Sequence, residues 1–320
     1  MLPPILLLAA LIGFYLAARS ARIGNNLTTL ASLFPLIGLV CVSAATGKSE
    51  MALGAILSAS VASLGLVAGM ALLQRRPADP PGPETGTWAL LTPVALAILL
   101  IGLSGDLGPV ALLALLALAL VLIPAVRVPP LPVLPQPTPT SELAPPPTPP
   151  PTPRPPLADL AVFFLAFLVS LLAGWAAIEG ATLLSLRNTN APAGLLAACV
   201  LGPASTMPFL GLVIARANDG HTYHALGLCV RFALTAVLTL LPLAALIHFA
   251  RAYLLSAPTL AMPFPATLWR IETVLLLAIS VLLVPLSSGR FTPKKRDGAL
   301  LLALYVVYLI LSALGGARLF

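Results

Sequence analysis

The residues that could carry out chemistry are few in this sequence, and they are scattered. The chain of 320 residues holds ten Asp and Glu and three His. No Ser, Thr or Cys stands at a spacing that would pair a nucleophile with a base, and there is no glycine-rich phosphate loop. No pair of carboxylates falls inside an apolar segment. The sequence therefore predicts neither an enzyme nor a resident cofactor, and we expect no catalytic residue.

Metal-ligating side chains are equally sparse. His221 and His224 lie three residues apart beside Asp219, but a zinc site needs a further ligand and none is nearby. We expect these residues to form a solvated turn. The three cysteines all lie in apolar segments, where a small buried hydrophobe is the usual role: Cys41, Cys199 and Cys229. No metal site is predicted.

The elements that must position these residues are membrane helices. The chain is 59% hydrophobic and only 8% charged, whereas a soluble domain has about 25% charged residues. Ten apolar runs have roughly the length, about 17–25 residues, that a helix needs to cross a bilayer. They are Leu2–Ala18, Gly24–Ala45, Met51–Leu73, Gly86–Leu103, Gly108–Val126, Leu157–Ile178, Ala191–Ala215, Tyr223–Ala250, Thr267–Leu286 and Ala299–Leu314. The expected fold class is an all-α integral membrane protein.

A proline-rich stretch, Pro129–Pro156, divides these runs into five and five. Proline cannot donate a backbone hydrogen bond, so this stretch is expected to be an extended polyproline II tether. A ligand for an SH3-like domain is the alternative. The predicted domains are a first five-helix repeat over residues 1–127, a linker over 128–156, and a second five-helix repeat over 157–320.

Basic residues predict how the chain is oriented. With ten spans, eleven of the 17 Lys and Arg fall in loops on the side of the linker and five on the other. The positive-inside rule then places the linker in the cytoplasm and both termini outside. We expect a bacterial inner membrane. The lipid bilayer is the expected partner, and nucleic acid is not, because the positive charges lie at the ends of apolar runs.

The second and third runs resemble the seventh and eighth. Each pair has a proline expected to break its helix, Pro35 or Pro208, then a polar turn and an Ala-Leu-Gly triplet. Each proline precedes the triplet's glycine, Gly54 or Gly227, by 19 positions. Because five helices is an odd number, two such halves would enter the membrane from opposite sides. The pattern predicts an inverted repeat, which is a transporter architecture.

This pattern is similar to that of the sodium/calcium exchanger (cation/calcium antiporter) superfamily. Its two alpha-repeats carry a motif of the form G-T-S-x-P-E, a polar turn, and then A-L-G-N-x-x-G-S-N-x-x-N. The resemblance extends over nearly the whole chain in layout and is strongest over 23–73 and 194–246. It implies five plus five helices. It also implies a central site at which glutamates and asparagines bind calcium and the exchanged sodium or protons.

The ion ligands of that family are missing at the matching positions, so the alpha-repeats are degenerate. The two glutamates fall on Leu36 and Phe209, and the first asparagines on Ala55 and Leu228. The hydroxyls that remain around this former site are Ser32, Ser58, Ser60, Ser63, Ser205 and Thr206. Calcium takes six to eight oxygens, several of them anionic. Neutral hydroxyls do not offset its dehydration.

Arg231 is a charge about eight residues into an apolar run, roughly 12 Å deep at 1.5 Å per residue. An arginine within the membrane normally faces the protein interior. One hypothesis is that its guanidinium lies in or beside the former ion site as a tethered cation. The alternative is that Arg231 snorkels along its own helix to the interface.

The remaining polar residues near span ends are predicted to anchor the helices at the interface. These are Glu179 and Glu272, for which a proton path is the alternative, and the tryptophans Trp88, Trp175 and Trp269. The run Lys294–Arg296 is expected to contact lipid on the cytoplasmic side.

Three functions remain open at this point. The first is a degenerate exchanger relative with a structural or regulatory role, for which a subunit of a larger membrane complex is one setting. The second is a working secondary transporter, either a cation antiporter or one whose substrate is selected by Arg231. The third is a membrane enzyme, which the missing catalytic groups argue against.

Overall fold

The computed structural model describes residue 12 and residues 28–74, 83–104, 106–126, 156–187, 193–255, 261–264, 266–287 and 292–317. All but one residue of the first predicted span, and nearly all of the proline-rich linker, lie outside these ranges. So does the very C-terminus.

Apolar runs become helices because a bilayer core offers no water to satisfy backbone N–H and C=O groups. Nine continuous helical stretches fill the described part of the chain, and they match the second to tenth predicted spans. They are α2 (Thr28–Ala45); α3 (Ser49–Ala62), η1 (Ser63–Val67) and α4 (Ala68–Gln74); η2 (Pro83–Leu90), α5 (Leu91–Ile101) and η3 (Gly102–Ser104); α6 (Pro109–Val126); α7 (Pro156–Arg187); α8 (Ala193–Leu196), η4 (Ala197–Leu201) and α9 (Gly202–Asn218); α10 (Thr222–Thr235), η5 (Ala236–Leu240) and α11 (Leu241–Leu254); α12 (Ala266–Ser287); and α13 (Lys295–Ala317).

Six of the described stretches are long and apolar enough to cross a membrane by length and composition. Three shorter apolar helices accompany them, over Ser32–Ala45, Thr87–Ile101 and Pro109–Pro124. Large apolar side chains are exposed on the outer faces of the bundle, among them Leu113 and Leu120 on α6 and Leu311 on α13. Such faces suit lipid rather than water. The chain is an integral membrane protein with an all-helical body, as the sequence predicts.

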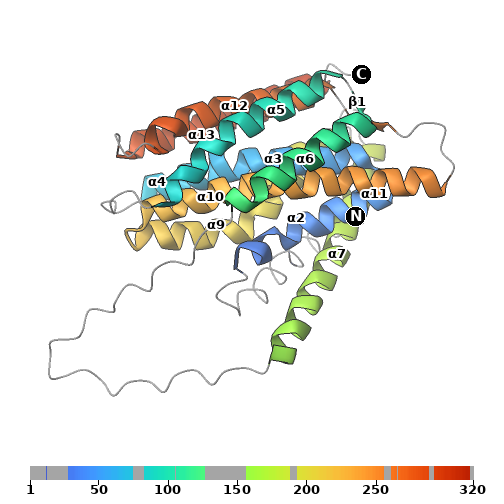
Figure 1. Cartoon of the computed structure of the whole chain (residues 1–320), viewed down its shortest axis with the longest axis horizontal. Helices are drawn as coiled ribbons and strands as arrows, with labels where there is room; N and C mark the ends of the chain where they lie inside the picture. Colours follow the sequence, from blue (N-terminus) through green and yellow to red (C-terminus); the bar gives the residue numbers. More distant parts are fainter. Residues whose placement is uncertain are drawn as a thin grey trace.

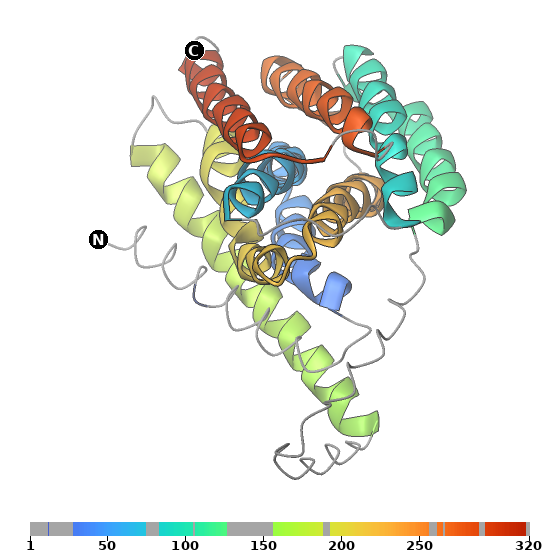
Figure 2. The ribbon, with the colours of Figure 1, turned by 90° about the vertical axis from the view of Figure 1, so that its left-hand side faces the viewer.

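The helices form a bundle in which the two halves of the chain interleave. Helices α2, α3, α9 and α10 lie between α7 on one face and α5, α12 and α13 on the other (Figures 1 and 2). Helix α7 packs closely on α2, where the Ser170 hydroxyl donates to the Phe34 carbonyl. A Cβ atom on Gly38 would lie only 2.1 Å from the Ser170 carbonyl oxygen. Small residues at this crossing let the two backbones meet, as is usual between membrane helices.

A short pair of strands is a feature that an all-helical prediction does not contain. Strands β1 (Asp106–Leu107) and β2 (Met262–Pro263) pair antiparallel, with Asp106 opposite Pro263 and Leu107 opposite Met262. The pair joins the segment before α6 to the segment before α12. It therefore ties a loop of the first half to a loop of the second at one end of the bundle.

Two of the three tryptophans do not lie where the sequence predicts. Trp175 is half exposed, but Trp88 and Trp269 are buried, so an interfacial position is wrong for those two. The Trp269 indole N–H donates to the Ile98 carbonyl over 3.2 Å, and its ring packs against Phe264. Nearness to a span end in sequence does not separate an interfacial tryptophan from one covered by a neighbouring helix.

Candidate functional site

The two segments with the repeated sequence pattern also share their local geometry. Between its two helices each contains a turn that places a glycine at positive φ, 81° at Gly47 and 92° at Gly220. In both turns the residue after the glycine donates its N–H to a carbonyl five residues back, at 2.8 Å for Lys48 and 3.0 Å for His221. The two glycines are 173 residues apart, as are Pro35 and Pro208. One structural unit therefore occurs twice.

The match continues into the following helix. Both copies contain a π-helical segment, η1 beginning at Ser63 and η5 beginning at Ala236, and these residues are again 173 apart. π-helical turns are rare and occur frequently at functional sites. Their repetition at equivalent positions shows that the correspondence extends beyond apolar composition.

The prediction that the two prolines break their helices is wrong. Pro35 lies inside continuous α2 and Pro208 inside continuous α9. A proline removes one hydrogen bond in the helix interior, and membrane helices accommodate this because neighbouring groups satisfy the freed carbonyl. In the second copy the irregularity is η4, which ends immediately before α9 begins.

The first copy lines its interior with small or apolar side chains. Leu36, where the resemblance implies a glutamate, is completely buried. Ala55 and the hydroxyl residues of α3 and η1 are buried as well: Ser58, Ser60 and Ser63. Ser32 on α2 is buried to a slightly smaller degree. No acidic side chain is among these positions.

The second copy is filled by larger groups. Phe209, at the position of the second glutamate, is 1% exposed, and its ring stacks on Phe232 with centroids 4.9 Å apart. Leu228, Ser205 and Thr206 are also buried. The described residues therefore place no carboxylate at either of the matched glutamate positions.

The hydroxyl groups of this region donate hydrogen bonds to carbonyls of their own helices. Ser58 donates to the Ala55 carbonyl and Ser60 to the Ile56 carbonyl, at 3.3 and 2.8 Å. In the second copy, Ser205 donates to Gly202 and Thr206 to Pro203, at 2.6 and 2.7 Å. Such bonds back to the preceding turn satisfy a hydroxyl in an apolar setting. The oxygens are neutral, and they offer a divalent cation no compensating charge.

The two copies lie against each other at these residues. A Cβ atom on Gly202 would be 1.7 Å from the Ser58 Oγ and 2.9 Å from the Ala55 carbonyl oxygen. The Ser63 hydroxyl donates to the Ser60 carbonyl at 2.9 Å and lies 3.4 Å from the Cys229 carbonyl of α10. Ser58 and Ser63 of the first copy thus pack tightly against α9 and α10 of the second.

Arg231 belongs to this region by position. It is the tenth residue of α10, and Ser58 is the tenth residue of α3, so the two occupy equivalent places. Only 8% of Arg231 is exposed, which means that the side chain packs inside the protein rather than extending over its surface. A buried arginine requires compensation from the dipoles or charges around it.

Glu272, predicted to anchor α12 at the interface with a proton path as the alternative, is buried in the structure. Glu272 is the seventh residue of α12 and is 1% exposed, so an anchoring role at the interface is wrong for it. Its Oε1 lies 3.1 Å from the Tyr308 hydroxyl on α13. Glu179 remains near the surface, where it pairs with Lys48 at 3.4 Å. The two carboxyls stand at similar distances from a span end in sequence, and only the packing of α13 and α3 over α12 distinguishes them.

The histidine turn contains no metal centre. His221 and His224 are half buried at the start of α10, and the His221 carbonyl accepts the Ala225 N–H. Among the described residues no three His, Cys, Asp or Glu side chains lie together as ligands for a metal ion. Of the cysteines, Cys229 is buried, and Cys41 and Cys199 are half buried.

No protein-family model matches the chain, and no curated protein matches it either. Solved structures do. The crystal structure of the H+/Ca2+ exchanger CAX is 15% identical with a TM-score of 0.68, covering 98% of this chain and 82% of that one. The selenium-substituted Ca2+/H+ antiporter protein YfkE is 14% identical with a TM-score of 0.69, covering 98% and 91%. The sodium-calcium exchanger NCX_Mj is 14% identical with a TM-score of 0.56, covering 97% and 95%.

These neighbours are all cation/calcium exchangers, so the resemblance inferred from the sequence is confirmed at the level of the fold. At 14–15% identity the likeness concerns the fold and leaves the activity of this chain open.

Proposed function

We propose that this chain is an exchanger-fold membrane protein that does not exchange calcium, and that it serves a structural or regulatory role as a subunit of a membrane complex. One observation carries the proposal. Both positions that the resemblance assigns to ion-binding glutamates, Leu36 and Phe209, hold apolar side chains buried in the packed centre. A protein that keeps the exchanger fold but lacks both anionic ligands cannot offset the dehydration of calcium.

Packing supports the same conclusion. The stacked rings of Phe209 and Phe232 occupy the space next to Pro208 on α9. Aromatic side chains of this size exclude a hydrated ion and provide no lone pairs to a dehydrated one. The hydroxyls nearby already donate to carbonyls of their own helices.

Arg231 adds an electrostatic argument. In our proposal its guanidinium is a tethered cation that stands where the exchangers hold a transported one. A second unit positive charge about 4 Å away would be repelled by about 4 kcal/mol at an effective dielectric constant near 20. A divalent ion would feel twice that repulsion. The buried position of Arg231 at the place equivalent to Ser58 is what supports this role.

Calcium flux tests the proposal directly. Purified protein in liposomes, given an outward sodium or proton gradient, should take up no more calcium than protein-free liposomes. An authentic exchanger of the same fold, reconstituted in parallel, serves as the positive control. Robust gradient-driven calcium uptake by this chain would overturn the proposal.

The tethered-cation role has its own test. Arg231→Ala should lower the thermal stability of the protein in detergent and open a leak for monovalent cations in liposomes. Arg231→Lys, which keeps the charge, is the matched control and should remain tight. If Arg231→Ala neither leaks nor loses stability, Arg231 does not fill the former site.

The partner part of the proposal is tested by isolation. Extraction from its native membrane in a mild detergent should recover the chain with stoichiometric membrane-protein subunits, read by mass spectrometry and by mass from light scattering. Recovery as a monomer with lipid alone would contradict a role within a complex.

A working secondary transporter is the second candidate. The buried position of Arg231 favours it, because an interior guanidinium can attract an anion as well as exclude a cation. In that case a panel of small anions should include one that raises the melting temperature of the protein. The effect should disappear in Arg231→Ala, and the same anion should exchange across liposomes.

We further propose the membrane orientation and the domain boundaries that the sequence predicts. The termini lie outside a bacterial inner membrane, and a cytoplasmic linker over 128–156 joins repeats over 1–127 and 157–320. Close packing of Gly69 on α4 against Gly298 on α13 supports it, since the last turn of α4 then lies beside the start of α13, which carries the basic residues Lys295 and Arg296. Labelling of single cysteines introduced at 48 and 295 with a membrane-impermeant reagent tests it: only position 48 should react from outside.

A further inference from the structure

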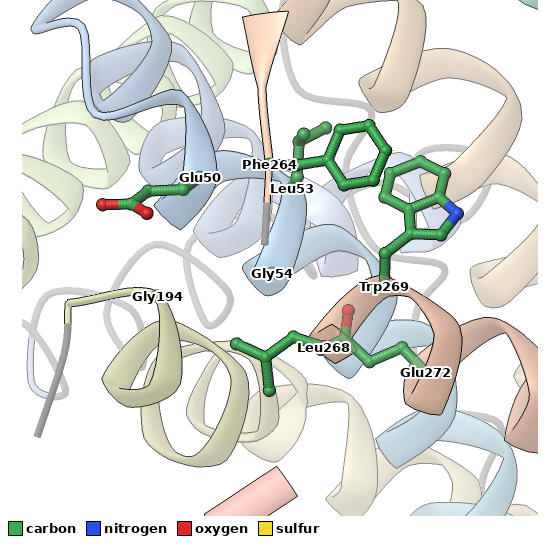
Figure 3. A pocket seen from close by; sticks show the side chains of 8 residues that line it. All are labelled: Glu50, Leu53, Gly54, Gly194, Phe264, Leu268, Trp269 and Glu272. Atoms are coloured by element: carbon green, nitrogen blue, oxygen red, sulfur yellow. The ribbon is translucent and has the colours of Figure 1, made fainter. Parts of the chain in front are cut away.

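A buried carboxyl that the proposed function does not use lies at the end of the bundle where α3, α8 and α12 begin. Glu272 is one and a half turns into α12, and its side chain extends from that helix toward α3 (Figure 3). Among the described residues Glu272 takes part in no ion pair. Its side chain makes a polar contact with Tyr308, a residue that is itself completely buried.

The Tyr308 hydroxyl is shared between two partners. It lies 3.1 Å from Glu272 Oε1 and 3.2 Å from the Ala198 carbonyl oxygen in η4. A tyrosine hydroxyl has one hydrogen, and a carbonyl can only accept. When Tyr308 donates to Ala198, its contact with Glu272 is a hydrogen bond only if the carboxyl is protonated and donates in turn. When Glu272 is ionised, Tyr308 must turn its hydrogen to the carboxylate.

The Ala198 carbonyl has a specific need for that hydrogen. In an α-helix it would accept from the N–H of residue 202, but Gly202 donates to Ala197 in the π-helical segment. In a π-helix it would accept from residue 203, which is Pro203 and has no N–H. A buried carbonyl without a donor is costly. The hydrogen-bond inventory therefore favours the arrangement in which Tyr308 serves Ala198 and Glu272 is a neutral acid.

The ionisable neighbours do not offer Glu272 a counter-charge. Among the described side chains, Tyr308 approaches from α13, Cys199 from η4 and Glu50 from the start of α3, and the Tyr305 ring lies 5.9 Å from that of Tyr308. Of the other segments packed on α12, α5 and η3 carry no ionisable residue and η2 carries one, the acidic Glu84. Arg270 lies on α12 itself but is exposed on its surface. A carboxyl in such surroundings is held without charge unless water reaches it.

A small cavity lies beside Glu272. It has a volume of about 10 Å³ and is lined by Glu50, Leu53, Gly54, Gly194, Phe264, Leu268, Trp269 and Glu272 (Figure 3). That volume corresponds to roughly one water molecule. Glu50 is exposed and its carboxylate is directed away from Glu272 (Figure 3), so the cavity lies close to the surface at the start of α3.

We propose that Glu272 is a proton-binding site whose occupancy decides whether Tyr308 donates its hydrogen bond to Ala198 in η4 or to Glu272 itself. When Glu272 holds a proton, Tyr308 donates to Ala198 and stabilises η4, the π-helical segment that precedes α9. Release of the proton removes the donor from Ala198 and loosens the segment, which packs on α3 at the centre of the bundle. The site senses pH at the end of the bundle where α3, α8 and α12 begin. This proposal stands apart from the proposed function, because protonation of Glu272 is measured without any transported ion.

Two readouts test the site on the full-length protein in lipid nanodiscs. Infrared spectra taken from about pH 5 to about pH 10 should contain the carbonyl stretch of a buried protonated carboxyl. That band should vanish in Glu272→Gln and persist in the surface control Glu50→Gln. Hydrogen exchange of the amides at 199–202 should accelerate roughly 2- to 10-fold in wild type as the band titrates, which is the equivalent of one hydrogen bond.

Variants separate this device from mere packing. Glu272→Gln keeps an N–H donor for Tyr308, so exchange at 199–202 should stay slow at every pH. Tyr308→Phe should exchange fast at every pH while the carboxyl band still titrates, which keeps the test decisive if Glu272→Gln folds poorly. A missing band, or pH-dependent exchange that survives in Glu272→Gln, would overturn the proposal. So would loss of the band at constant pH on adding sodium or calcium, since the site would then take a metal cation.

Discussion

The two copies of the repeated unit share their turns and one π-helical segment but differ in the side chains packed around them. Their turns, π-helical segments and prolines fall 173 residues apart throughout. Yet the first copy presents serines and Leu36 to the centre, whereas the second presents Phe209, Phe232 and Arg231. The backbone geometry is therefore set by a few glycines and helix ends. The chemistry at the centre is free to change around it.

Exchanging residues between the copies should give the largest effect. Ser58→Arg places the second copy's charge in the first, where Gly202 already packs within contact of the Ser58 hydroxyl. An unpaired charge with no room should cost more than about 4 kcal/mol and abolish recovery of folded protein. Size-exclusion chromatography in detergent would detect the loss. Ser58→Ala should behave like wild type, and a well-folded Ser58→Arg would mean that the two positions are interchangeable.

Truncating the aromatic pair should come next. Phe209→Ala should destabilise the protein by about 3–5 kcal/mol, because the ring is fully buried on Phe232. The double variant with Phe232→Ala should cost less than the sum of the two, since they share one contact. Thermal unfolding in detergent measures all three. Leu36→Ala, its counterpart in the first copy, should cost a comparable or smaller amount, about 2–5 kcal/mol; strict additivity would deny the coupling.

The contact between the copies should be sensitive to a single methyl group. Gly202→Ala would bring a Cβ atom to 1.7 Å from Ser58 Oγ and 2.9 Å from the Ala55 carbonyl oxygen, and the latter cannot move easily. We expect a loss of about 1–3 kcal/mol from overpacking. Gly54→Ala is the matched control, because its nearest neighbour, the Gly194 carbonyl oxygen, would be 3.3 Å away. If both variants unfold at the same temperature, the close approach at Gly202 is not a constraint.

The turn glycines should show the smallest effects and a small difference between copies. Gly220→Ala should cost about 1 kcal/mol, because alanine disfavours positive φ. Gly47→Ala should cost more, since its Cβ atom would also meet the Arg251 Nη1 at 2.5 Å. Paired melting curves would rank the two. The reverse order would mean that the Arg251 side chain moves aside without penalty.

How far the site follows from the sequence differs from residue to residue. Leu36, Phe209 and Arg231 could be singled out because the equal spacing of proline and Ala-Leu-Gly aligns the two copies. That alignment pairs each position of one copy with a position of the other. Glu272 and Tyr308 lie outside that alignment on α12 and α13, so no spacing links them. The continuous helices through Pro35 and Pro208 were also not foreseeable, because neighbouring groups decide whether a proline ends a membrane helix.

Composition and periodicity by themselves determined that the chain is a bundle of apolar helices, roughly where each helix lies, and that one unit occurs twice. These follow from the absence of water in the bilayer core, which requires each segment to satisfy its own backbone. Tertiary structure alone decided which polar side chains are covered. Glu179 remains at the surface, Glu272 is sealed beneath Tyr308, and Arg231 is enclosed, because burial depends on which helix packs against which face.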